Sequence, residues 1–202
     1  VGLNFGLPLG VLSGLVGALI SMERNLKGFS GLFAAIGFAI PIAVVVGYLY
    51  AKLLESVKGQ EMMVGTYVGF STVAVMCVFW LLAPFKNPEL IWAIGGKGLR
   101  FTLTLGNHFG KVLNEFAVFQ LFGVKISAGL LGFFLLFCLL IYFFYKTKLG
   151  IAMLAAGANP VFARSAGIDV RSMKAVGVVL STVLAAIGII IYAQSYGFLQ
   201  LY

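Results

Sequence analysis

The stretch ISAGLLGFFLLFCLLIYFFY, residues 126–145, contains twenty residues and not one Asp, Glu, Lys or Arg. A helix that rises 1.5 Å per residue needs about 20 mostly apolar residues to cross a hydrocarbon core about 30 Å thick. Four further blocks have the same character: residues 1–22, 31–51, 62–85 and 175–193, the last with an apolar tail to Tyr202. The sequence therefore predicts an all-α, polytopic transmembrane helix bundle with about five spans.

The composition supports a membrane environment. The chain is 61% hydrophobic and 10% charged, with a mean hydropathy of +1.08, whereas soluble domains carry about 25% charged residues. The formal net charge is +8, but the basic residues are scattered singly between apolar blocks. Such loop charges face anionic lipid headgroups, so we expect membrane lipid as a partner and no nucleic acid.

Four connections join the blocks. Residues 23–30 and 52–61 are short and charged, residues 86–125 are long and mixed, and residues 146–174 are polar and rich in Gly and Ala. Within the long connection, residues 116–124 are apolar but too short to span, which predicts a re-entrant or interfacial piece. Basic residues are balanced between the two sides, so charge alone does not fix the topology. We interpret residues 1–202 as a single transmembrane domain that is incomplete at both ends, because both ends lie in apolar runs.

Small residues mark the first block. Gly10, Gly14 and Gly17 give it small faces, which allow close helix approach in a bilayer. We expect these faces to pack within the chain rather than to form a dimer motif. Residues 4–10 include Pro8 and two glycines, and they predict either a broken helix beside a polar cavity or a frayed helix start.

Enzyme signatures are almost absent. His108 is the only histidine and Asp169 the only aspartate, so the paired acids and bases that hydrolases use are missing. We predict no catalytic residue, no metal site and no cofactor, and we expect His108 at a water interface. The sequence has no phosphate-binding loop, so any ATP hydrolysis is expected in a separate subunit.

No ionisable side chain falls inside a predicted span, which argues against a proton relay or a gating-charge element. Weakly polar side chains remain as candidates to line a path for a neutral polar solute. The alternative use of such groups is hydrogen bonding between helices, worth about 0.6 kcal/mol on average. The candidates are Asn4, Thr66, Ser71, Thr72 and Gln194.

The most informative connection contains GIAMLAAGANPVFARSAGIDV, residues 150–170. Asn159 is suited to cap a helix, Pro160 to occupy its first position and Gly167 to end it. These residues predict a short helix of about two turns that lies across the membrane surface between two spans.

At this point the sequence resembles a known family. AGANP at residues 156–160 and ARSAGI at residues 163–168 are similar to the cytoplasmic loop of the ABC-importer permeases for ribose and other simple sugars, nucleosides and branched-chain amino acids. Lys174 and Ser181 fit the continuation of that pattern, and residues 4–6 and 47–66 resemble earlier parts of it. The resemblance covers most of the chain in order, although members of the family have more spans after this point.

The resemblance implies a coupling loop that docks on an ATP-binding subunit, with residues 146–174 cytoplasmic and residues 86–125 extracytoplasmic. It also implies a second permease subunit, identical or different, and an extracytoplasmic solute-binding protein, all at a bacterial inner membrane. The docking residues carried over by position are Gly157, Asn159, Pro160, Ala163, Arg164, Gly167 and Ile168.

The predicted function is thus that of a permease subunit of an ATP-binding cassette importer. It would move a small polar solute inward, and the weakly polar lining favours a sugar or a nucleoside over an ion. The alternatives are a channel or facilitator without an ATPase, a secondary transporter and, last, a membrane enzyme.

Overall fold

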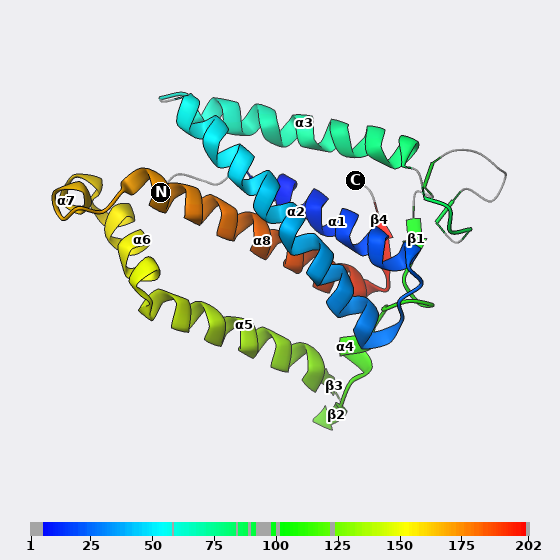
Figure 1. Cartoon of the computed structure of the whole chain (residues 1–202). Coiled ribbons are helices and arrows are strands. Elements are labelled where there is room, and N and C mark those ends of the chain that lie inside the picture. Colours follow the sequence, from blue (N-terminus) through cyan, green and yellow to red (C-terminus); the bar gives the residue numbers. More distant parts are fainter. Residues whose placement is uncertain are drawn as a thin grey trace.

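The computed structural model describes residues 6–57, 59–83, 85–88, 90–91, 98–99, 102–121 and 124–200, and for residues 120, 121 and 124–126 it describes the backbone alone. Asn4 therefore lies outside the described residues. The elements, labelled in Figure 1, run in the order α1 Leu7–Glu23, α2 Gly28–Ser56, α3 Glu61–Leu82, β1 Thr102–Thr104, α4 Val112–Glu115, β2 Val118–Leu121, β3 Val124–Ser127, α5 Ala128–Lys146, α6 Lys148–Ala158, α7 Pro160–Ser165, α8 Val170–Tyr196 and β4 Phe198–Gln200.

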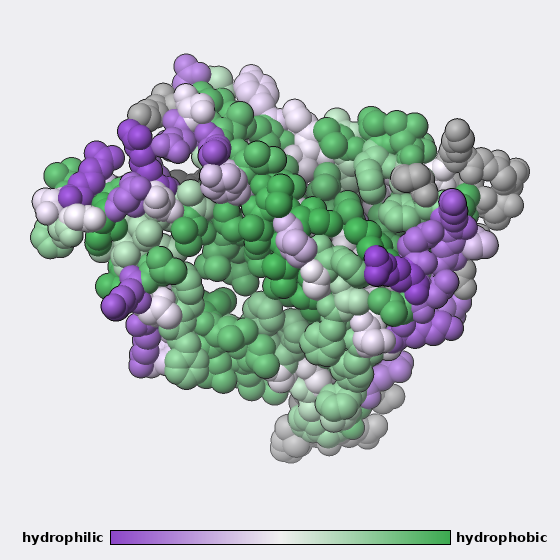
Figure 2. Space-filling model, in the orientation of Figure 1, coloured by the Kyte–Doolittle hydropathy of each residue, from purple (hydrophilic) through white to green (hydrophobic). Residues whose placement is uncertain are grey.

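The predicted membrane bundle is confirmed. Among the described residues four helices are long and apolar enough to cross a bilayer: α2, α3, α5 and α8. The first block contributes α1, which has 17 described residues and a length of about 26 Å at 1.5 Å per residue. Figure 2 shows a broad apolar band between hydrophilic regions at opposite ends of the molecule. The chain is therefore a multi-pass membrane protein.

The centre of the bundle is α1, which packs between α2 and α8 (Figure 1). A Cβ atom built on Gly10 would lie 2.6 Å from the Cβ of Ala185, and one on Gly17 would lie 2.7 Å from the Cβ of Ala39. A side chain at either position would overlap the neighbouring helix, so glycine is what permits this approach. The expectation that these small faces pack within the chain is confirmed.

Pro8 lies in the first turn of α1, where its missing amide hydrogen costs no helix hydrogen bond. The described part of α1 thus starts at Leu7 and continues unbroken to Glu23. Because Gly10 touches Thr182, about halfway along α8, the first turn of α1 lies near the middle of the bundle. Residues 1–5, where the broken-helix and frayed-end interpretations differ, lie outside the described residues.

Connections gather at two opposite ends, which we name by their short helices (Figure 1). The α4 end contains the α1–α2 turn, β1, α4, the strands β2 and β3, and β4. The α7 end contains the α2–α3 turn, α6, α7 and the first turn of α8. Two ion pairs join parts of the α7 end: Arg171 Nη1 lies 3.5 Å from Glu55 Oε1, and Lys174 Nζ lies 3.9 Å from Glu61 Oε1.

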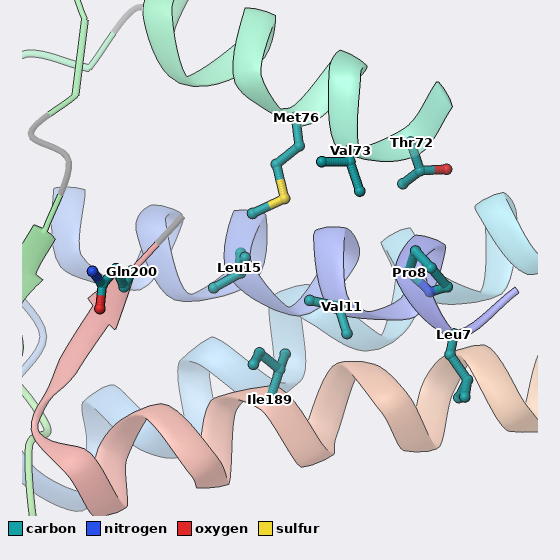
Figure 3. Close-up of a pocket in the computed structure, with 9 residues that line it drawn as sticks. All are labelled: Leu7, Pro8, Val11, Leu15, Thr72, Val73, Met76, Ile189 and Gln200. Carbon is teal, nitrogen blue, oxygen red and sulfur yellow. The ribbon is translucent and has the colours of Figure 1, made fainter. Parts of the chain in front are cut away.

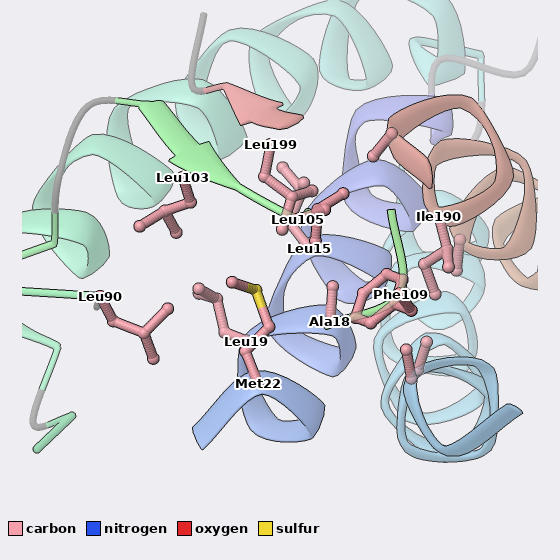
Figure 4. Close-up of a cluster of buried hydrophobic side chains, with 14 of the residues drawn as sticks. Leu15, Ala18, Leu19, Met22, Leu90, Leu103, Leu105, Phe109, Ile190 and Leu199 are labelled. Atoms are coloured by element: carbon pink, nitrogen blue, oxygen red, sulfur yellow. The ribbon is translucent and has the colours of Figure 1, made fainter. Parts of the chain in front are cut away.

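The α4 end holds much of the buried core. Figure 4 shows Leu15, Leu19 and Met22 of α1 together with Leu103 of β1 and Leu199 of β4, all at most 3% exposed. The two strands form an antiparallel pair with Leu103 opposite Leu199. This pair ties the end of α8 to the connection that follows α3, so that segments far apart in sequence close the end of α1.

Residues 116–124 were expected to be a re-entrant or interfacial piece, which stays a prediction, and within them Val118–Leu121 forms the first strand of an antiparallel pair. Strands β2 and β3 pair antiparallel, with Val118 opposite Ser127. The span predicted over residues 126–145 accordingly starts at Ala128, because Ser127 caps it: its Oγ accepts a hydrogen bond from the amide of Leu130 at 3.3 Å.

The connection of residues 146–174 is more helical than predicted. Helix α6 fills its first part, where Thr147 Oγ1 accepts a hydrogen bond from the amide of Gly150 at 3.1 Å. A Cβ on Gly150 would lie 2.7 Å from the Cα of Tyr145. The sharp turn between α5 and α6 therefore depends on glycine, a steric requirement that hydropathy does not reveal.

Candidate functional site at the α7 end

Helix α7 has the capping that the sequence predicts. Asn159 Oδ1 accepts hydrogen bonds from the amides of Val161 and Phe162, both at 3.1 Å, and Pro160 occupies the first turn. Gly167 ends the helix at a φ of +80°, a conformation that favours glycine. The prediction of a short capped helix is confirmed, with six residues rather than two full turns.

A small apolar cluster holds α7 in place. Ala163 is fully buried and packs with Ala156 of α6 and Val170 of α8, while Ile168 and Met173 border the cluster. The amide of Ile168 also donates to the Ala163 carbonyl at 2.9 Å. Helix α7 is thus fixed to both of its neighbours instead of hanging free.

The predicted docking residues separate into two groups. Ala163 is buried, and Gly157 and Ile168 are partly buried, so these three residues support α7 from within. The exposed ones are Asn159, Pro160, Arg164 and Gly167. The docking role itself stays a prediction.

Sequence reasoning missed the two most prominent side chains of α7. Val161 is 77% exposed and Phe162 is 65% exposed, at the tip of the molecule outside the long apolar helices (Figure 1). Helical spacing could have indicated their exposure. If Ala163 faces the neighbouring helices, the two residues before it lie on other faces of α7. Exposed aromatic side chains on a rigid support are typical anchors of protein interfaces.

The start of α8, which follows α7, is capped by a carboxylate. Asp169 precedes α8 and accepts hydrogen bonds from Ser172 Oγ at 2.7 Å and from the amide of Arg171 at 3.0 Å. These two bonds, the first of them foremost, hold the pKa of the Asp169 carboxyl below its ordinary value. The carboxylate therefore stays ionised and caps α8 at neutral pH.

The candidate pathway residues do not converge. Thr66, Ser71 and Thr72 lie on α3, whereas Gln194 lies near the end of α8. Ser71 is exposed, and the hydroxyl of Thr66 donates to the carbonyl of Met62 at 2.9 Å. Asn4 lies outside the described residues, so its predicted place beside them is not tested.

Thr72 is the candidate that lines a cavity. A pocket of about 360 Å³ lies between α1, α3 and α8, and Figure 3 shows its lining. Its wall combines Pro8, Val11 and Leu15 of α1 with Met76 of α3, and its polar lining residues are Thr72 and Gln200. The Thr72 hydroxyl bonds to the carbonyl of Val68 at 2.7 Å, so the wall is predominantly apolar.

Gln194 is fully buried, and its side chain forms hydrogen bonds with residues of α4. Its Oε1 accepts from the amide of Leu113 at 3.2 Å, and its Nε2 donates to Oδ1 of Asn114 at 3.3 Å.

The expected place of His108 at a water interface is wrong, because its side chain is 5% exposed. Phe109, its neighbour, belongs to the buried core, which draws this connection inward.

Comparison with known proteins identifies the family. A search of protein families matches residues 2–202 to the family described as branched-chain amino acid transport system / permease component. No curated protein and no solved structure matches. The match covers nearly the whole chain and agrees with the resemblance carried by residues 156–168, and such permeases are transport subunits that associate with an ATP-binding subunit rather than catalytic subunits. With its apolar helices and its capped surface helix, the chain belongs to the branched-chain amino acid and simple-sugar permease family of ABC transporters.

Proposed function

We propose that this chain is the permease subunit of an ABC importer that moves a small polar solute inward across the bacterial inner membrane. ATP would be hydrolysed in a separate cytoplasmic subunit that docks on α7. A second permease subunit, identical or different, and an extracytoplasmic solute-binding protein would complete the transporter. The α7 end would then face the cytoplasm and the α4 end the exterior.

The observation that carries this proposal is the construction of α7. Its tip presents Val161 and Phe162 to solvent, while Ala163 locks the same helix to α6 and α8. An exposed apolar knob outside the bilayer costs solubility unless a protein covers it. Its rigid support means that a displacement of the knob reaches the spanning helices through packed side chains instead of being absorbed by a loose loop.

The apolar cavity supports a preference among solutes. A fully hydroxylated sugar needs a hydrogen-bonding partner for each hydroxyl that loses water, whereas the described wall offers mainly Leu15, Val11 and Met76. Within the sugar or nucleoside class, a nucleoside fits this wall better, because the flat faces of its aromatic base can pack against apolar side chains. A branched-chain amino acid is the second candidate, because its aliphatic side chain suits the same wall. Competition of uptake by ribose, a nucleoside and leucine separates the three.

Docking is tested with Phe162→Ala in the transporter reconstituted in liposomes with its ATP-binding subunit and binding protein. We expect ATP-driven uptake to fall about tenfold or more, as for an interface anchor worth about 2 kcal/mol. The control is Phe143→Ala, since Phe143 is 60% exposed but lies in the span α5. Equal uptake by both variants would contradict the docking role.

A pair of glycines gives a second test of the same site. Gly167 and Gly28 both have positive φ values, +80° and +62°, and a Cβ on either would meet nothing within 4 Å. Alanine at each position therefore introduces similar backbone strain, at opposite ends of the molecule. We expect Gly167→Ala to uncouple ATP hydrolysis from uptake and Gly28→Ala to preserve the coupling.

Sidedness is tested by labelling. Asn159→Cys, in a background where Cys77 and Cys138 are replaced by serine, should react with a membrane-impermeant maleimide in inverted vesicles and stay unlabelled in intact cells. Labelling of this cysteine from outside intact cells would contradict the proposal of an ATP-driven importer. It would not affect the conclusion that the chain is a bundle of membrane-spanning helices.

A further inference from the structure

Helix α8 links the two ends of the molecule directly. It has 27 residues, or about 40 Å at 1.5 Å per residue, and it runs from α7 to the α4 end (Figure 1). Its first turn is held by the buried Val170 and by the ion pair of Arg171 with Glu55. A displacement of α7 therefore moves this turn as well.

The other end of α8 is bound to α4 through a polar cluster. Besides the two side-chain bonds of Gln194 to α4, the Gln194 carbonyl accepts from the amide of Lys111 at 2.7 Å. Asn114 Nδ2 donates to Ser195 Oγ at 3.0 Å. With the bond from Asn114 Nδ2 to the Ser195 carbonyl at 3.3 Å, five polar contacts, four of them through side chains, fix a helix of four residues on the last turns of α8.

Helix α4 is also joined to α5. Ser127 Oγ donates to the carbonyl of Leu113 at 2.7 Å, and a Cβ on Gly129 would lie 2.5 Å from the same oxygen. Elsewhere α5 stands apart from α8: none of its residues is buried, and a cavity of about 750 Å³ lies between the two helices, reaching Asn114 and Ser127. Helix α4 is therefore the bridge between α8 and α5 at this end.

From these contacts we infer that α4 moves with α8 during transport, and that Gln194 is the positioning residue that holds it there. This inference rests on the proposed function, since it assigns the route by which a displacement of α7 reaches the opposite side. The amide of Gln194 suits the role because it accepts and donates at once. A leucine would fill a similar volume and leave the amide of Leu113 and the oxygen of Asn114 without this partner.

The first experiment is a cross-link in the reconstituted transporter. Asn114→Cys and Ser195→Cys are combined in the background without Cys77 and Cys138 and oxidised to completion, with each single-cysteine variant as the control. If α4 and α8 move as one body, the cross-linked transporter keeps at least half of its ATP-driven uptake. Loss of uptake that a reductant restores would overturn the inference, because it would mean that the two helices separate in the cycle.

The second experiment separates positioning from simple stability. Gln194→Leu should lower the number of solute molecules moved per ATP about tenfold, within the usual range of coupling between sites, while the rate of ATP hydrolysis, measured below the melting transition, stays near that of the parent. The exchange Gln194→Asn with Asn114→Gln preserves both amides and the total length, and it should restore most of the lost coupling.

The outcomes distinguish the two proposals. If the unmodified transporter shows no ATP-dependent uptake, the proposed function fails, and this inference fails with it. If uptake is ATP-dependent but Gln194→Leu reduces uptake, hydrolysis and melting temperature together, Gln194 is merely structural, and this inference alone is overturned.

Discussion

The two ends of the molecule are built in opposite ways. At the α4 end, bonds join residues far apart in sequence: Glu23 accepts from the amides of Lys86 and Asn87 at 3.0 and 3.1 Å, and β1 pairs with β4. At the α7 end, the side-chain hydrogen bonds of Asn159 and Asp169 reach no further than three residues along the chain. Distant segments are joined there by exposed ion pairs, Arg171 with Glu55 and Lys174 with Glu61. The α4 end is therefore buried by contacts between distant parts of the chain. The α7 end is ordered by helix caps within its own short segment and stays exposed.

This difference has a functional meaning. At the α4 end the chain buries its own apolar side chains, whereas at the α7 end apolar side chains stay exposed, as suits a surface that binds a partner. Phe109, Leu103 and Leu199 are at most 1% exposed at the α4 end, whereas Val161 and Phe162 are the outermost apolar groups at the α7 end. Burial of side chains from distant parts of the chain stabilises the whole fold. Local capping keeps a docking helix ordered before its partner binds. Substitutions that act on stability should therefore concentrate at the α4 end and the bundle core, and those that act on docking at the α7 end.

The largest effect on stability is expected where α1 packs on α8, in the core between the two ends. Gly14→Val should destabilise the bundle by about 3 kcal/mol, because a Cβ there would lie 3.0 Å from the Cα of Ala186. Thermal unfolding in detergent would measure it. The same change at Gly37, whose Cβ would meet nothing within 4 Å, is the control. A Gly14→Val protein as stable as that control would contradict the close packing of α1 on α8.

An intermediate effect compares one asparagine from each end. Asn87 Nδ2 donates to the carbonyl of Met22 and to Oδ1 of Asn25, both at 3.1 Å, and Asn87 is 9% exposed. Asn87→Ala should lower the global stability by about 1–3 kcal/mol, the cost of buried polar groups that lose a partner.

Asn159→Ala removes an exposed cap and should cost about 1 kcal/mol in α7 itself. It should leave the melting temperature nearly unchanged while hydrogen exchange in α7 accelerates. If both alanine variants melted at the same reduced temperature, the two ends would not differ in the way described here.

The smallest effect is the pH dependence of the Asp169 cap. Its pKa is lowered in the folded protein, so the carboxylate stabilises the start of α8 above its ordinary pKa near 3.8. That contribution is lost as the pH falls through the lower folded value. Amide protection in the first turn of α8 should drop below about pH 4, and Asp169→Asn should abolish this step. A step of equal size in the variant would assign it to another group.

Much of the fold could be predicted from periodic features of the sequence. Apolar runs indicated the spanning helices, and the cap, proline and glycine around α7 each act within a few residues, so local chemistry was sufficient. The same local logic did not indicate the strand pair that begins within residues 116–124, because a strand such as β2 is defined by its partner β3. It also missed α6, whose start depends on Thr147 and on the contact of Gly150 with α5.

The candidate site was only partly predictable for the same reason. Asn159 and Gly167 were found because their roles are conformational. Val161 and Phe162 were missed because exposure is a property of the packed structure. Gln194 looked like a pathway residue in the sequence, but its contacts with Leu113 and Asn114, about 80 residues away along the chain, give it a different use.

The tight elbow at Gly150 has a mechanical consequence. Helix α6 has 11 residues, about 16 Å at 1.5 Å per residue, and a Cβ on Gly150 at its start would lie 2.7 Å from the Cα of Tyr145. If a partner pushes α7 sideways, as the proposed docking implies, α6 would transmit that push to α5 as a lever about 16 Å long. A shorter or longer α6 would then change the displacement of α5 without altering a residue of the contact surface.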